Sequence, residues 1–377
     1  MTPAPAAKRN RRGFWLALVL LLAVLLEMAA CLGCRTLTAR GIFYQPRPDA
    51  DFAGYLKQRH PVLSWPGGDD FSPRRAPESE RRAGQPALVS LYGESFTFGS
   101  EVSDDEAWGN QLAARLDARV DNFGVGGYGT DQALLRYQLN TNDHARVVVL
   151  GIVTENLMRN VNQYRDLLYA SGGLGFKPRF TLNATNGLEL VPLFTPDVAE
   201  YPAFARDPGR WLPHEFFLPE GGRGVGASEF PFTLSLARST RHFSVGLRWR
   251  GEPWHADFFR ADHPSRALPL TVAIVREFER TCRARGQTPL ILLLPTGRDL
   301  QHFRRHGRWI HAPLTEALGP GAQVLDVAAG FAREVPAERF ETLYITPSRH
   351  MNAAGNARLA DLVAARVREV MVVKAAP

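Results

Sequence analysis

A serine and a histidine that lie far apart in the chain are the side chains best suited to chemistry. Ser95 follows Gly93 and Glu94, at the point where the apolar run 86–91 ends. That run is typical of a buried strand, because it is short and is bounded by proline and glycine. Ser95 therefore stands just past a strand's carboxyl end, where ligands bind in open α/β sheets. The alternative interpretation is an ordinary strand-to-helix turn whose serine caps the helix.

Other predicted strand ends also carry polar or glycine-rich residues. The segment 124–130 contains four glycines, including Gly127, and follows a short predicted strand. Glu155 and Asn156 follow the clearest buried strand in the chain, and His350 lies where a loop enters the C-terminal helix. Because the carboxyl ends of parallel strands share one edge of a sheet, we expect these residues to converge on the serine.

These residue types together suit acyl transfer. A serine hydroxyl becomes nucleophilic when a base removes its proton, and histidine can do this near neutral pH. Donors must also meet the carbonyl oxygen as it becomes negative, and backbone N–H groups with an amide side chain can provide them. The sequence has a candidate for each part.

The elements that must position these residues alternate between strand and helix. The predicted strands are 86–91, 119–123, 145–153, 289–295 and 322–327. Helical patterns separate them, which predicts an α/β fold with a doubly wound, mostly parallel sheet over about 85–372.

The alternation breaks down between about residues 160 and 263. This stretch is too long for a structureless loop, so we predict a subdomain inserted at the active edge of the sheet. Its aromatic residues either form platforms for a sugar or acyl group or supply the insertion's own small core. They are Tyr164, Tyr169, Phe176, Trp211, Phe216, Phe217, Phe230, Phe232, Trp249, Trp254, Phe258 and Phe259.

The chain begins with a basic cluster and a long apolar stretch. Residues 13–33 are long enough to span a bilayer if Glu27 lies near the outer interface. We predict a cytoplasmic basic tail at 1–12, a single-pass signal anchor at 13–34 and a polar tether at 35–84. A cleaved signal peptide and lipid attachment at Cys31 are the alternatives, and all three export the rest of the chain to the periplasm or the outside.

Charge and cysteine content narrow the class of protein. The net charge of +7 and the pI near 9.6 could indicate a nucleic-acid partner, but the arginines are scattered and no nucleic-acid motif occurs. We expect no nucleic-acid partner, and a basic surface that lies near anionic lipid or glycan. Of the three cysteines only Cys282 lies in the body of the protein, so no disulfide framework exists. No Cys/His spacing indicates a zinc site, and we predict no metal.

Four short blocks, taken in order, resemble the signature blocks of the SGNH, or GDSL-type, hydrolase family. They are Gly93-Glu94-Ser95-Phe96, Asn122-Phe123-Gly124-Val125-Gly126-Gly127, the strand end with Glu155-Asn156, and His350-Met351-Asn352-Ala353-Ala354-Gly355. The resemblance covers about 86–370, apart from the insertion, and implies a flavodoxin-like fold.

The resemblance also implies roles for individual residues. Ser95 would be the nucleophile and His350 the base. The backbone amides of Ser95 and Gly127, with the Asn156 side chain, would form the oxyanion hole. Such enzymes are esterases, lipases, thioesterases or carbohydrate deacetylases, and they need no metal or organic cofactor.

The chain departs from the family pattern in the first and third blocks. Glu94 stands where the family usually has aspartate, a change that keeps the charge and that we expect to be harmless. In the third block, either Glu155 or Asn156 can occupy the usual asparagine position. A carboxylate cannot donate to an oxyanion, so an inward Glu155 would weaken the hole.

A third departure concerns the acid that orients the histidine. The family carries an aspartate two or three residues before the histidine, and here Ser348 and Pro347 stand at those positions. Losing that carboxylate costs on the order of 10⁴ in turnover in the serine-protease template. Asp326 or Glu341 could substitute from elsewhere, or the site could work as a Ser-His dyad.

Taken together, these features favour a membrane-tethered, exported serine esterase. Its expected partners are the membrane, through the N-terminal helix, and a small molecule or envelope polysaccharide that bears an ester-linked acyl group, for example acetyl, or a lipid. The alternative is a catalytically weakened SGNH-like protein that binds glycan or scaffolds an envelope assembly, and the missing aspartate favours it.

Overall fold

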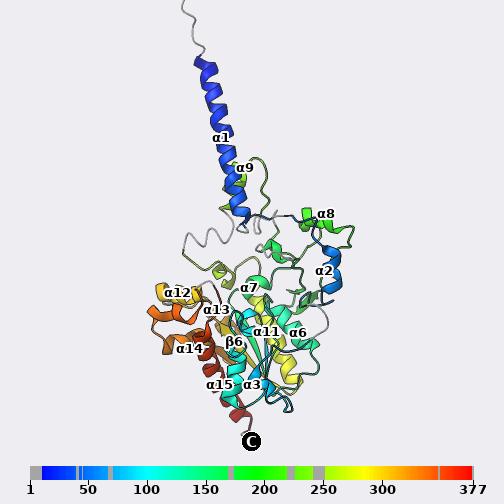
Figure 1. Cartoon of the computed structure of the whole chain (residues 1–377), viewed down its shortest axis with the longest axis vertical. Coiled ribbons are helices and arrows are strands. Elements are labelled where there is room, and N and C mark those ends of the chain that lie inside the picture. The colour runs from blue at the N-terminus through cyan, green and yellow to red at the C-terminus, as the bar shows by residue number, and fades with distance from the viewer. Residues whose placement is uncertain are drawn as a thin grey trace, which may run out of the picture.

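A five-stranded parallel sheet forms the centre of the domain in the computed structural model (Figure 1). The structure describes residues 11–39, 42–44, 46–66, 71–168, 174–218, 226–240, 251–346 and 349–375. The sheet contains β1 (Val89–Tyr92), β2 (Val120–Asn122), β3 (Val147–Val153), β6 (Thr288–Leu294) and β7 (Val324–Asp326).

The strand order is β2-β1-β3-β6-β7, and every neighbouring pair is parallel. Among the strands of this sheet, counted along the chain, that order is 2-1-3-4-5, the flavodoxin-like arrangement. The order reverses between β1 and β3, which is where such sheets bind ligands. The predicted α/β fold with a mostly parallel sheet is confirmed.

Helices cover both faces of the sheet because side chains on a strand alternate between its faces. Val147 and Val149 face one hydrophobic cluster, which contains residues of α5 (Trp108–Leu116), α14 (Val327–Glu334) and α15 (Ala353–Ala375). Val148 and Leu150 face the other cluster, which contains residues of α6 (Thr130–Leu139) and α11 (Ala267–Ala284). With both faces covered, β3 is apolar at nearly every position and fully buried.

Short helices connect the strands and the longer helices. They are α4 (Ser95–Phe98), α7 (Asn156–Arg159), α12 (Gly297–His306), α13 (Ala312–Leu318) and the 3₁₀ helix η5 (Ala337–Leu343). The insertion contributes η1 (Arg165–Leu167), the hairpin β4 (Arg179–Leu182) and β5 (Leu188–Val191), α8 (Tyr201–Arg206), η2 (Pro208–Arg210), α9 (Phe232–Ser239) and η4 (Ala256–Phe259).

Most aromatic residues of the insertion that the structure describes belong to, or pack against, the hydrophobic cluster that also covers one face of the sheet. Phe176, Phe204 and Phe217 are fully buried, and Phe258 is 2% exposed. The core interpretation therefore applies to these rings, and they are not platforms open to a ligand. Tyr169 and Trp249 lie outside the described residues, and Phe230 is exposed.

The segment 35–84 packs against the domain in the part that the structure describes. It forms α2 (Phe52–Gln58) and α3 (Pro77–Glu80). Phe52 stacks on Tyr201 of the insertion with ring centroids 4.3 Å apart, and Leu63 is fully buried. The polar composition predicts a free tether, but a few apolar side chains are enough to hold this segment on the domain.

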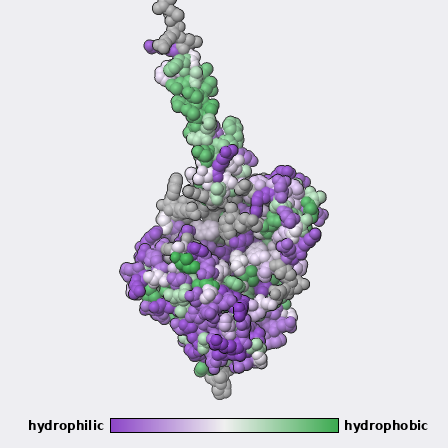
Figure 2. Space-filling model, viewed as in Figure 1, coloured by the Kyte–Doolittle hydropathy of each residue, from purple (hydrophilic) through white to green (hydrophobic). Residues whose placement is uncertain are grey.

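The N-terminal helix α1 (Arg11–Ala39) projects from the domain, and its side chains form a column of apolar surface (Figure 2). It extends beyond the predicted end at residue 34. It is long and apolar enough to cross a membrane. The chain's C-terminus lies at the opposite end of the molecule from α1 (Figure 1).

Gly151 allows α4 to lie against β3. A Cβ at Gly151 would overlap Thr97 Oγ1, and Thr97 is fully buried. We predict that Gly151→Ala destabilises the fold by about 1–3 kcal/mol, because the overlap pushes α4 off the sheet. Thermal unfolding followed by circular dichroism measures the change. Gly321→Ala is the matched control, since nothing lies within 4 Å of a Cβ there. Equal unfolding midpoints for the two variants would contradict the prediction.

Candidate active site

Ser95 is the first residue of α4 and follows the carboxyl end of β1. The α4 helix ends at Gly99, whose φ of 78° is left-handed and turns the chain away after a single turn. Ser95 is partly exposed, so its hydroxyl can reach a ligand at this edge of the sheet.

His350 meets Ser95 at this edge, although the two residues are 255 positions apart. Its Nε2 lies 2.7 Å from Ser95 Oγ. The Phe96 ring packs against the imidazole at a centroid distance of 4.9 Å. Ile345 N donates to the His350 carbonyl at 3.0 Å, which fixes the backbone just before α15. The structure thus brings together the predicted nucleophile and base.

Glu101 supplies the carboxylate beside the histidine. Its Oε2 lies 2.7 Å from His350 Nδ1 and accepts the His350 backbone N–H at 3.3 Å. Arg349 forms an ion pair with Oε1 of the same carboxylate. The Arg349 hydrogen bond, with those of His350, lowers the pKa of Glu101 to about 2, so the group is ionised at neutral pH.

Glu101 is held in an uncommon backbone conformation. Its φ of 69° is left-handed, which costs free energy for a residue with a side chain. Arg74 braces the loop on both sides of it. The nearly buried Arg74 guanidinium donates to the carbonyls of Phe98 at 2.6 Å and Val102 at 3.0 Å. The segment predicted to be a tether therefore positions the acid of the site.

The two acids predicted as substitutes lie elsewhere, and this prediction was wrong. Asp326 caps α14 through Ala329 N at 3.0 Å and lies 3.0 Å from His311 Nε2. Glu341 pairs with Arg304 at 3.1 Å. Sequence reasoning missed Glu101 because it sought the acid near the histidine. The available signal was an acid six residues after the serine, beyond a glycine that ends the turn.

Asn156 does not point its amide into an open oxyanion site in this structure. It is fully buried, and its Nδ2 donates to Glu94 Oε2 at 3.1 Å and to Thr130 Oγ1 at 3.3 Å. The carboxyl group of Glu94 is also buried, which raises its pKa, and it accepts Val153 N–H at 3.4 Å. Glu94 thus accepts a hydrogen bond from the Asn156 amide. The expectation that glutamate at position 94 is harmless did not include this contact.

Glu155 does not replace the asparagine as a donor either. Its carboxylate accepts from Arg159 at 3.0 Å and from the indole N–H of Trp254 at 3.1 Å. Glu155 and Asn156, the two candidates for the asparagine position, therefore both form hydrogen bonds with neighbouring residues. The remaining donors at the site come from the backbone.

Gly127 lies in the loop after β2, which is fastened to the serine turn by Val125 N donating to Gly93 O at 3.0 Å. Gly127 has a left-handed φ of 82°, and its carbonyl accepts from Arg165. In the part of the chain that the structure describes, no acceptor bonds to the N–H of Ser95 or of Gly127. Both N–H groups are available to a substrate oxygen.

A cavity of 690 Å³ opens beside this loop. Trp65 and Arg165 line it together with Gly126 and Gly127, and Tyr55 and Arg59 of the preceding segment form another part of the wall. The Trp65 indole donates to Gly126 O at 2.9 Å, so the ring is fixed against the loop. The cavity offers both aromatic surface and cationic groups to a ligand.

One cluster among the described residues has the side chains and spacing of a cation site. His302 and His306 lie one turn apart on α12, and their ligand atoms lie within 4.8 Å of each other and of those of Glu252. His302 Nδ1 is 2.6 Å from Glu252 Oε2, as in an ion pair. Burial lowers the pKa of His302. None of the three contacts Ser95 or His350, so the cluster is separate from the candidate active site.

Comparison with known proteins gives only distant similarities. No model of a known family matches the sequence, and no curated protein sequence matches it. One solved structure has 17% identity and a TM-score of 0.38, and the match covers 76% of this chain and 97% of the other. Another, a protein from Desulfitobacterium hafniense DCB-2 described as a lipolytic protein of the G-D-S-L family, has 11% identity and a TM-score of 0.35 over 74% of this chain and 98% of its own. At these sequence identities and TM-scores, neither structure assigns an activity to this chain.

The low pKa of Glu101 makes stability depend on pH in a definite direction. A carboxyl whose pKa falls on folding stabilises the protein fully above its ordinary value of 4.5, and this contribution is lost as pH falls toward about 2. We predict that Glu101→Gln has a lower thermal midpoint than wild type at neutral pH. The difference should shrink as pH falls through this window. A difference that does not change between pH 6 and pH 2 would contradict the ion pairs described here.

The environment of Asn156 predicts that it mainly stabilises the fold. Asn156→Ala removes the amide that bonds to Glu94 and Thr130 and leaves the buried Glu94 carboxyl group with only the Val153 N–H at 3.4 Å, which should cost about 1–3 kcal/mol of unfolding free energy. Denaturant titration measures this loss. Any esterase turnover of the folded fraction should fall by less than the roughly 10²–10³ expected for an oxyanion donor. A larger loss of turnover without a loss of stability would show that the amide rotates toward the substrate.

Proposed function

We propose that this chain is a serine ester hydrolase with Ser95 as nucleophile, His350 as base and Glu101 as the orienting acid. One observation carries the proposal. Hydrogen-bond contacts of 2.7 Å each run from Ser95 Oγ to His350 Nε2 and from His350 Nδ1 to Glu101 Oε2. This is the nucleophile, base and acid arrangement of serine hydrolases.

Each residue has a definite step in the reaction. Ser95 Oγ attacks the ester carbonyl while its proton moves to His350 Nε2. Glu101 holds the opposite N–H and stabilises the positive imidazole that forms. The N–H groups of Ser95 and Gly127 donate to the carbonyl oxygen as it becomes negative. His350 then returns the proton to the leaving alcohol, and a water molecule, activated by the same histidine, releases the acyl group from Ser95.

The position of Glu101 bears on the competing hypothesis of a catalytically weakened relative. The best support for that hypothesis is the absence of an aspartate before His350. Here a carboxylate from the loop after α4 contacts the imidazole. This contact favours the hydrolase proposal over the scaffold hypothesis. The order of the four blocks, from Gly93 to Gly355, supports an SGNH-type assignment as part of the proposal.

The surroundings of the site support an acylated, polar substrate near a membrane. The carboxyl edge of the sheet, where α7 and α12 begin, faces the end of the domain from which α1 leaves (Figure 1). Beside Gly127, the cavity presents Trp65, Arg59 and Arg165. Aromatic and cationic groups suit sugars and anionic headgroups. We infer that the substrate is an ester-linked acyl group, such as acetyl, on an envelope glycan or lipid.

The basic residues at the start of the chain support export of the domain. Arg11 and Arg12 begin α1 at the end far from the domain, Lys8 and Arg9 precede them in the sequence, and positive charge favours the cytoplasmic side. We propose that α1 anchors the chain in the membrane with the catalytic domain on the outer side.

Hydrolysis of p-nitrophenyl acetate by the full chain in detergent tests the catalytic assignment. Ser95→Ala should reduce turnover to background, because it removes the nucleophile. Glu101→Gln should reduce turnover by on the order of 10⁴, because the imidazole loses its orienting charge. Glu341→Gln is the matched control and should keep wild-type turnover, since Glu341 contacts Arg304 instead. Equal turnover of wild type and Ser95→Ala would refute the proposal.

A further inference from the structure

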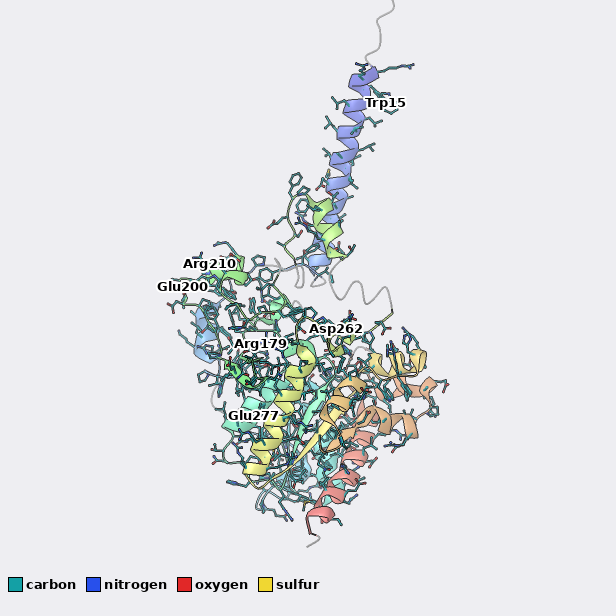
Figure 3. All side chains as sticks on the ribbon, turned by 180° about the vertical axis from the view of Figure 1, so that it is seen from behind. Trp15, Arg179, Glu200, Arg210, Asp262 and Glu277 are labelled. Atoms are coloured by element: carbon teal, nitrogen blue, oxygen red, sulfur yellow. The ribbon has the colours of Figure 1, made fainter. Side chains whose placement is uncertain are left out.

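The insertion returns to the N-terminal helix through α9. This helix lies beside the domain-proximal half of α1 in both views of the chain, whereas Trp15 marks the distant end (Figures 1 and 3). Leu236 would contact a Cβ at Gly33 at 3.4 Å, and Cys34 Sγ donates to Phe232 O at 3.7 Å.

Glu27 is bonded to the start of α9. It is the only charged residue between Arg12 and Arg35. Its Oε2 accepts Phe232 N–H at 2.7 Å, and its Oε1 accepts Thr233 N–H at 3.3 Å and also the Thr233 hydroxyl. The carboxylate therefore caps the N-terminus of a helix that lies more than 200 residues away in the sequence.

In a membrane, this contact would reduce two free-energy costs. A carboxylate within a membrane helix costs about 2.5–3.5 kcal/mol on insertion scales. Free N–H groups in the first turn of a helix cost several kcal/mol more where no water is present. Glu27 and α9 each supply what the other lacks. With a rise of 1.5 Å per residue, Glu27 lies roughly 9 Å deeper than Gly33.

The hydroxyl groups of the segment are also bonded. Ser239 Oγ and Thr240 Oγ1 donate to the carbonyls of Leu236 and Ala237 at 2.7 and 2.6 Å. These hydroxyls satisfy groups that a helix leaves free at its C-terminal end. The backbone of Glu229 is bonded to Ser235 Oγ, while the charged side chains of Glu229 and Arg238, at the two ends of the segment, are exposed.

Two large apolar side chains of the segment remain uncovered. Phe230 is 75% exposed and Leu234 is 45% exposed. Their surface continues that of α1, whose apolar side chains are also exposed (Figure 2). These observations describe a short helix with exposed apolar side chains, whose first turn is bonded to the carboxylate of Glu27 in α1.

We propose that the tip of the insertion, residues 230–237 between the exposed charges of Glu229 and Arg238, enters the outer half of the bilayer beside α1, with Phe230 and Leu234 against lipid acyl chains. The occupant is lipid because the exposed surface is continuous with that of α1. This inference rests on the membrane anchoring proposed above. A second attachment would restrict rotation of the domain about α1 and hold the active edge at a fixed distance from the membrane surface.

Spin-label accessibility in vesicles tests the proposal on the full chain. Cys31, Cys34 and Cys282 are replaced by alanine, and a nitroxide is attached to a cysteine placed at Phe230. Electron paramagnetic resonance then measures collisions with oxygen, which enters lipid, and with a nickel chelate, which stays in water. Labels at Leu20 in α1 and at Val198, which is 52% exposed on the domain, serve as the lipid and water references.

At position 230 we expect high oxygen access and nickel access as low as at position 20. Nickel access equal to that at position 198, with position 20 shielded, would overturn the inserted tip and leave the anchor intact. Nickel access at position 20 as well would refute the anchor itself. Protection of position 230 from both reagents would indicate a protein partner or a second copy, and this would overturn lipid as the occupant.

Substitution of Glu27 tests the bond that holds the tip. In Glu27→Leu, α9 loses its cap, so nickel access at position 230 should rise while position 20 stays shielded. Thr36→Ala is the control, because the Thr36 hydroxyl bonds only to Leu32 O within α1. Unchanged access at position 230 in Glu27→Leu would show that Glu27 does not hold the tip in place.

Discussion

The hydrogen bond between Ser95 and His350 depends on the order of the central sheet. β1 delivers the serine beside β3, and the loop before α15 delivers the histidine from the other end of the chain. α15 is held against α5 by Asn356, whose Oδ1 accepts Trp108 N–H at 3.1 Å. α5 also packs against β1. The helix α15, which follows His350, and the strand β1, which precedes Ser95, therefore belong to the same hydrophobic cluster. The contact between the Ser95 and His350 side chains therefore depends on the packing of the whole core.

Buried polar groups explain why the candidate site differs from a simple reading of its blocks. Glu94 is one carbon longer than aspartate, and its carboxyl group occupies the amide of Asn156 inside the sheet edge. The carboxylate that contacts His350 is that of Glu101, which belongs to the loop after α4. That loop needs external support because Glu101 has a left-handed backbone, and Arg74 provides it. Contacts made by Glu94, Glu101 and Arg74, which belong to different segments, therefore determine the local arrangement of the candidate site.

Polar groups that need hydrogen-bond partners also connect α1 and the insertion. A carboxylate in an apolar helix and the free N–H groups of a short helix stabilise each other at Glu27. The insertion thus has two parts with different roles. Its aromatic core packs on the domain, and its apolar tip extends along α1. In this arrangement the carboxyl edge of the sheet faces the end of the domain from which α1 leaves.

The local pattern of the sequence determined the α/β class, the strand positions and the long apolar helix, because burial on both faces and helical amphipathicity leave periodic signals. It also indicated Ser95 through the glycines that bracket its turn, and His350 through its place where a loop enters the C-terminal helix. Only the tertiary structure decided that Glu101, not Asp326 or Glu341, contacts the histidine. It also decided that Asn156 faces Glu94, that the segment around Arg74 packs on the domain, and that Glu27 caps α9. Each of these outcomes depends on side-chain contacts between distant segments, and no periodicity along the chain records such contacts.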